Sequence, residues 1–244
     1  VDRDTLPAGS LFYSLHRDED SLYFISPRAK YSLSQLNIKA DSVRYLLVAD
    51  AIIQPHRQRV EVDAKNRMLP LRQSKITANF TERFHNIYDA VVSVPSRKRY
   101  FGTGTIDYVD ERDSIQPVKL KEIGVDNRGS TFAKGTLTQP DNFKLSPHFG
   151  FIGDFDLIAM DKFWVFDGGA QPIHPCVPIR SSNIKFKAQI NPESVLIPFS
   201  ERPQNINNVN LISGSVITVD SIHLYPAYVS GRKEYSDRTL VNAY

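Results

Sequence analysis

The chain is dominated by short runs in which apolar and polar residues alternate with a period of two. In the run 149–159, the odd positions carry Phe, Gly, Leu or Ala, whereas Asp154 and Asp156 occupy even positions. Successive side chains of a strand point to opposite faces of a sheet. This run therefore predicts a β-strand with one buried face and one partly exposed face.

Alternation of this kind recurs along the whole sequence, and clusters of turn-forming residues separate the runs. The further runs are 21–25, 59–63, 88–94, 104–109, 117–123, 183–190 and 215–219. Helical spacing occurs only over 64–73 and 81–89, and Pro70 interrupts the first of these. Many short strands with almost no helix predict an all-β, mostly antiparallel fold.

Two stretches, 25–55 and 145–172, follow a similar order of features. Each contains Ser-Pro, an alternating segment that ends on a small residue, an Asp, a second apolar run, and a closing Gln-Pro. A repeated unit that cannot cover its own apolar face has to pack against its neighbour. The similarity of the two stretches predicts a β-sandwich or jelly-roll-like stack with an internal duplication. The alternative is that two ordinary β-hairpins resemble each other by chance.

The duplication suggests two β units, 1–125 and 126–244, or one continuous β domain. A chain of 244 residues is long enough for either arrangement. Because it begins at Val1 rather than at Met, we interpret the sequence as a piece of a longer protein.

The charge, the cysteine content and the length of the apolar runs limit which partners and structural features the sequence can be expected to have. Thirty basic against 27 acidic residues leave a net charge of only +3, which does not indicate nucleic acid as a partner. The single Cys176 excludes an internal disulfide framework and a multi-cysteine metal site. No apolar run reaches the roughly 18 residues of a transmembrane helix.

Part of the first stretch resembles a known family. "LNIKADSVRY" (36–45), followed by "ADAIIQP" (49–55) and "VEV" (60–62), resembles the OstA-like (lipopolysaccharide-transport) β-jelly-roll repeats of bacterial envelopes, although the family's turn glycines are largely missing here. More broadly, the chain resembles the large β-rich envelope and surface proteins of Gram-negative bacteria. The resemblance implies an extracytoplasmic location, in the periplasm or at the cell surface, and supplies no catalytic motif.

The acidic strand is the first candidate for chemistry. Asp154 and Asp156 lie on one face of one strand, where paired carboxylates could serve as the acid and base of a glycosidase. They could also contribute oxygen ligands to Ca²⁺, the one cofactor that the sequence suggests. Alternate aspartates are equally typical of a half-exposed sheet.

Basic and aromatic residues supply the second set of candidates. Arg97, Lys98 and Arg99 precede two aromatic residues and could bind a phosphate, an acidic sugar or single-stranded nucleic acid, or could simply protect a sheet edge. Trp164 and Tyr108 could form an exposed platform on which sugar rings stack, or could belong to the core.

Taken together, these features favour a non-catalytic structural or binding module of a larger envelope or surface protein. Glycans, envelope components or another protein are the expected partners. The alternative is a carbohydrate-active enzyme or a carbohydrate-binding domain. An enzyme should place Asp154 or Asp156 on the floor of a cleft beside an aromatic ring, whereas a scaffold should place both on an open face.

Overall fold

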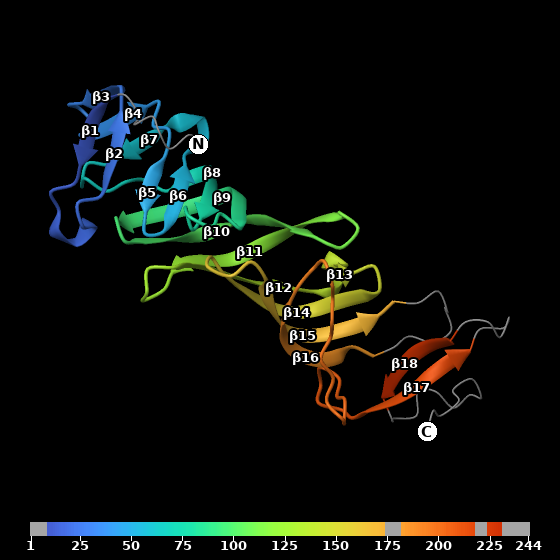
Figure 1. The fold of residues 1–244 in the computed structure, drawn as a ribbon. Helices are drawn as coiled ribbons and strands as arrows, with labels where there is room; N and C mark the ends of the chain where they lie inside the picture. The colour runs from blue at the N-terminus through green and yellow to red at the C-terminus, as the bar shows by residue number, and fades with distance from the viewer. Residues whose placement is uncertain (1–8, 174–181, 218–223, 231–244) are drawn as a thin grey trace. The chain divides into compact units, whose positions relative to one another are not determined.

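The computed structural model describes residues 9–173, 182–217 and 224–230 (Figure 1). Within these ranges the chain forms 18 β-strands and three short 3-10 helices, and no α-helix. All strand pairs with a defined register are antiparallel. The predicted all-β, mostly antiparallel class is therefore confirmed.

The elements follow one another with short connections. The strands are β1 Ser10–Tyr13, β2 Tyr23–Ser26, β3 Arg28–Ser32, β4 Asn37–Asp41, β5 Leu46–Val48, β6 Ala51–Gln54, β7 Val60–Val62, β8 Leu71–Ala78, β9 His85–Ser96, β10 Arg99–Val109, β11 Ile115–Val125, β12 Thr131–Leu137, β13 Lys144–Ser146, β14 Phe149–Ile158, β15 Trp164–Pro172, β16 Ile184–Ile190, β17 Leu211–Ile217 and β18 Leu224–Ser230. The 3-10 helices are η1 Arg17–Glu19, η2 His56–Gln58 and η3 Gln139–Asp141. The segments 64–73 and 81–89, which had helical spacing, each begin with a turn and end inside a strand, β8 and β9 respectively.

The chain divides into two compact units, and each is assembled from three segments. Unit 1 contains residues 1–107, 117–135 and 157–162, and unit 2 contains residues 108–116, 136–156 and 163–244. The segments of the two units alternate along the chain, and the long strands β10, β11, β12 and β14 each contribute residues to both.

Unit 1 contains two small sheets and most of the strands of a larger one. β1 pairs with β2, and β3, β4 and β7 form a three-stranded sheet. In the larger sheet, β12, β11, β10, β9, β8, β6 and β5 are successive neighbours. The buried side chains of these strands in unit 1 are largely aliphatic; Tyr100, which is 2% exposed and hydrogen-bonds to Thr131, is an exception.

Unit 2 contains a meander of β13, β14, β15 and β16, together with the β17–β18 pair. The predicted alternation along 149–159 is confirmed in β14, where Phe151, Phe155 and Leu157 are buried and Asp154 and Asp156 are exposed. The buried side of unit 2 is largely aromatic, with rings from Tyr108, Phe143, Phe151, Phe155, Trp164, Phe166 and Phe186 in mutual contact.

The two similar stretches share a corner but not a strand path. Ser26 and Ser146 are both buried, and the hydroxyl of each accepts a hydrogen bond of 3.2 Å from the backbone N–H two residues further on. After this corner the two stretches differ. In the first stretch β3 and β4 form a hairpin with a turn at 33–36, whereas in the second stretch β14 continues as a single strand. Pairing with β15 keeps β14 extended along its length. If the comparison is continued past the two stretches, residues 60–62 correspond to residues 177–179, which lie outside the described residues.

Candidate functional site

Trp164 and Tyr108 belong to the core of unit 2 and not to an exposed platform. They are 6% and 4% exposed, and Trp164 stacks on Phe155 with ring centroids 5.2 Å apart. The Tyr108 hydroxyl donates a hydrogen bond of 2.9 Å to the Leu145 carbonyl, and burial raises the pKa of this phenol. Alternation predicted that Trp164 and Phe166 share a face, and the dense ring contacts there show that this face is covered.

Asp154 and Asp156 lie on an open strand face. Asp154 accepts a hydrogen bond of 2.7 Å from Thr136 and stands directly opposite Asp167 on β15. Asp167 in turn bonds Lys187 at 2.9 Å, and this hydrogen bond raises the pKa of the Lys187 ammonium. The exposed carboxylates are therefore accommodated by a hydroxyl and an ammonium group across neighbouring strands.

This acidic strand has no ligand set for a metal. Within the described ranges, no three His, Cys, Asp or Glu side chains come together so that they could hold a metal ion. Ca²⁺ requires six to eight oxygens. The hypothesis of a calcium site at Asp154 and Asp156 therefore finds no support in the geometry of unit 2.

Arg97, Lys98 and Arg99 lie at the turn between β9 and β10, and all three are exposed. The Arg97 guanidinium lies 5.3 Å from the centre of the Tyr23 ring, and Lys98 pairs with Asp20 at 3.5 Å. Arg97 and Lys98, but not Arg99, border a shallow hollow of about 970 Å³ beside the β1–β2 loop. The structure thus brings two of the three basic residues to the edge of a concave region.

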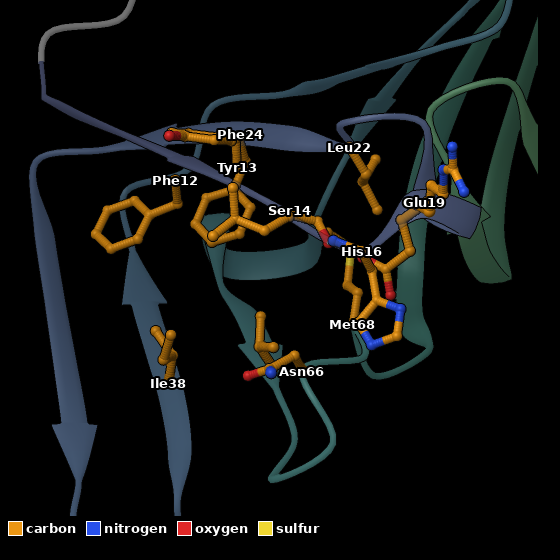
Figure 2. A pocket seen from close by; sticks show the side chains of 13 residues that line it. Phe12, Tyr13, Ser14, His16, Glu19, Leu22, Phe24, Ile38, Asn66 and Met68 are labelled. Atoms are coloured by element: carbon orange, nitrogen blue, oxygen red, sulfur yellow. The ribbon is translucent and has the colours of Figure 1, made fainter.

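A second cavity, which we call the apolar pocket, lies in unit 1 and is bordered by the same loop. Its volume is about 460 Å³. Figure 2 shows side chains converging on it from β1 and β2, from β4, and from the loop that carries Asn66 and Met68. Its lining residues are Phe12, Tyr13, Ser14, Leu15, His16, Arg17, Glu19, Leu22, Phe24, Ile38, Val62, Asn66 and Met68.

The first wall of the apolar pocket is formed by the β1–β2 hairpin. Phe12 and Phe24 are direct cross-strand partners, and their rings stack with centroids 5.2 Å apart and planes 12° apart. The loop between the strands is held closed by hydrogen bonds from Ser14 N to Leu22 O, at 2.8 Å, and from Leu22 N to Glu19 O, at 2.9 Å. These bonds keep the buried Leu22 side chain beside the rings.

The second wall comes from the three-stranded sheet and the loop after β7. Ile38 and Val62 stand opposite each other in register, and antiparallel partners project from the same face of a sheet. Met68 forms a bridge with Val62 that places its flexible thioether side chain in the wall. The loop is ordered by Asp63, which accepts backbone hydrogen bonds from Lys65 and Arg67; these bonds lower the pKa of its carboxyl group.

The chemistry of the apolar pocket is that of a binding site. Aromatic and aliphatic side chains form most of the lining, and a small number of polar groups accompany them, among which are His16 and Glu19 (Figure 2). Pockets for small molecules commonly have a volume of about 300–1,000 Å³, apolar walls and a few polar groups that orient the ligand. Tyr13 and Leu15 remain 60% and 87% exposed in this region.

Sequence reasoning missed this pocket. Phe12, Ile38 and Met68 come from three separate segments, and no motif links them. The run 21–25 predicted a strand, but not that Phe24 would stack on Phe12. The only local signal was the density of aromatic residues in 10–14 and 21–25, which is equally typical of a core hairpin.

Comparisons with protein-family models, with curated proteins and with solved structures found no match to this chain. The resemblance of 36–62 to the OstA-like repeats therefore stays an expectation from the sequence. Among the described residues, no helix has the length and apolar character needed to cross a membrane.

Proposed function

We propose that this chain is a non-catalytic binding module of a larger envelope or surface protein, and that its apolar pocket holds the apolar part of a ligand. The observation that carries the proposal is the cavity of about 460 Å³ lined by stacked rings and aliphatic side chains. An apolar cavity that is open to solvent favours a ligand that removes its walls from water.

The expected affinity depends on the apolar area that a ligand buries and on the cost of association. Burial stabilises the complex by about 25 cal/mol per Å², and the loss of translational and rotational freedom offsets part of this gain. Polar contacts to His16 or Glu19 would add to the affinity. We therefore expect weak binding, with a dissociation constant on the order of micromolar to millimolar.

The position of the acidic residues supports a non-catalytic role. In a glycosidase the two carboxyl groups flank the scissile glycosidic bond. Burial raises the pKa of the carboxyl group that acts as the acid. Asp154 and Asp156 are instead exposed on a strand, and Asp154 accepts a hydrogen bond from Thr136. The carbohydrate-active alternative is further weakened because Trp164 and Tyr108 contribute to a core.

The two methionines of the chain allow a matched test of the apolar pocket. Met68 lines the pocket, whereas Met160 is 65% exposed in unit 1 and lies outside it. We expect the neutral fluorophore N-phenyl-1-naphthylamine to bind saturably to the wild type and to Met160→Trp. Met68→Trp should fill the cavity and weaken binding at least tenfold. Equal affinity for the two variants would contradict the proposal.

The cellular placement rests on the resemblance to envelope repeats and is tested separately. We expect the full-length protein to fractionate with the periplasm or the cell surface. Its recovery in the cytosolic fraction would contradict this part of the proposal and would leave the binding role of the apolar pocket intact.

A further inference from the structure

We infer that unit 1 carries a second binding site, on the charged face of the β3–β4–β7 sheet, for a ligand bearing several sulfate or phosphate groups. This site is separate from the apolar pocket. The inference does not depend on the function proposed above.

Strand alternation gives the three-stranded sheet two unlike faces. Ile38 and Val62 point toward the apolar pocket. Their neighbours Lys39 and Glu61 stand opposite each other on the other face, and Lys30 is paired with Lys39. The same small sheet thus forms the wall of an apolar cavity on one side and presents charged side chains on the other.

Two adjoining hollows on the charged side concentrate cations. One, of about 370 Å³, is bordered by Arg28, Lys30, Asp41, Ser42, Arg57 and Arg59. The other, of about 280 Å³, shares Arg57 and Arg59 and adds His56, Arg72 and Glu61. Five permanent cations therefore face two carboxylates, whereas the whole chain has 30 basic against 27 acidic residues.

Most of these cations have no carboxylate partner within the described residues that neutralises their charge. Arg59 is held by Asp41 at 2.9 Å, which neutralises one positive charge. Across the described part of the chain, no carboxylate lies within ion-pair distance of Arg28, Lys30 or Arg57. The positive charge at the hollow of Arg28 and Arg57 is therefore largely uncompensated.

The segment that carries Arg57 is ordered by backbone hydrogen bonds. Gln58 N donates to Pro55 O at 3.0 Å, and Gln58 O accepts from Val43 N at 2.8 Å. Arg57 adopts a left-handed conformation with φ of 52°, which non-glycine residues occupy only when their surroundings hold them there. The exposed Arg57 side chain is thus presented from an ordered turn and borders both hollows.

The composition of the two hollows indicates the class of ligand. Four of the five permanent cations are arginines, whose planar guanidinium groups bind tetrahedral oxyanions through paired N–H donors. Among the described residues, no Phe, Tyr or Trp borders either hollow, so these residues offer no platform on which unpaired bases could stack. The ligand is therefore recognised by its sulfate or phosphate groups and not by nucleobases.

The test compares two double variants that remove the same charge from unit 1. Arg28→Gln/Arg57→Gln alters the proposed site, and Lys119→Gln/Lys121→Gln alters exposed lysines on β11. The probes are a heparin hexasaccharide, for sulfate groups, and linear polyphosphate of similar charge, measured by isothermal titration calorimetry in about 0.1 M salt. We expect saturable binding of at least one probe, a loss of at least tenfold in the first variant, and less than twofold in the second.

The tighter of the two probes identifies the source of the oxyanions. Failure of both probes to bind, or equal losses in the two double variants, would overturn the inference. So would binding of single-stranded DNA as tight as that of the better probe, because that result would indicate unselective attraction of polyanions. None of these outcomes affects the fluorophore titration of the apolar pocket.

Discussion

Phe12 and Phe24 stack face to face across the β1–β2 pair, with ring centroids 5.2 Å apart and planes 12° apart. Phe24 is 6% exposed, whereas Phe12 is only partly covered. The pair connects the stability of a two-stranded sheet to the shape of the apolar pocket. A two-stranded sheet is marginal by itself, so it depends on contacts of this kind.

We expect Phe24→Ala to destabilise unit 1 and to abolish fluorophore binding. Removal of a buried phenyl ring costs about 3–5 kcal/mol, through lost transfer free energy and the cavity that remains. Phe24→Leu keeps much of the volume and should cost less than about 2 kcal/mol. Urea unfolding followed by circular dichroism measures both. An alanine variant as stable as the wild type would show that the ring is not part of a packed wall.

The single tryptophan provides a spectroscopic test of the core of unit 2. Trp164 is 6% exposed and packs against Phe155, Phe166 and Tyr108. Its emission should be blue-shifted relative to free tryptophan and poorly quenched by acrylamide, and neither property should respond to oligosaccharides. Emission and quenching like those of a free indole would restore the exposed platform that the sequence also allowed.

Tyr108→Phe should destabilise unit 2. The hydroxyl satisfies the Leu145 carbonyl at 2.9 Å, and its loss leaves a buried acceptor unpaired, which costs about 1–3 kcal/mol. The control is Tyr88→Phe, because Tyr88 bonds Asp107 at a solvent-accessible position; its effect should stay within about 0.5 kcal/mol. Urea unfolding followed by Trp164 fluorescence reports the first variant, and circular dichroism the second. Equal stabilities of Tyr108→Phe and the wild type would contradict this account.

His85 should make the stability of unit 1 depend on pH. Its Nε2–H donates to the Asp161 carbonyl at 2.7 Å, and burial lowers the pKa of the ring below its ordinary value of 6.5. The unfolded chain therefore binds a proton more readily than the folded chain, and stability is lost as the pH falls below about 6.5, by at most about 1.4 kcal/mol per pH unit. His85→Gln should remove this part of the slope between pH 7.5 and 5.5. An unchanged slope would contradict it.

Local patterns of the sequence predicted the strands well because a strand's side-chain period is set by its backbone. The alternation predicted for 149–159 appears in the burial of β14 most clearly from Asp154 to Ile158, whereas Phe149 and Gly153 are only partly buried. The same pattern could not decide between core and surface for Trp164, because alternation shows which residues share a face and not which face is covered. For Trp164 the ring contact with Tyr108, which lies far away in sequence, shows that its face is covered.

The sites were harder to predict because pairing between distant segments creates them. Ile38 and Met68 line the same pocket because β4 pairs with β7. Arg28 and Arg57, which come from β3 and η2, border the same hollow although they are distant in sequence. The Ser-Pro corners at Ser26 and Ser146 do share their local hydrogen bond. The similarity of the following residues did not fix a common strand path, since hairpin formation depends on which partner strand is available.

The central claim is that the apolar pocket binds the apolar part of a ligand. Its most direct test is an ¹⁵N-¹H correlation spectrum of the wild type titrated with N-phenyl-1-naphthylamine. We predict saturable shift changes concentrated at Phe12, Phe24, Ile38 and Met68, and their loss in Met68→Trp. Changes that fail to saturate, or that fall mainly outside the walls of this cavity, would contradict the claim.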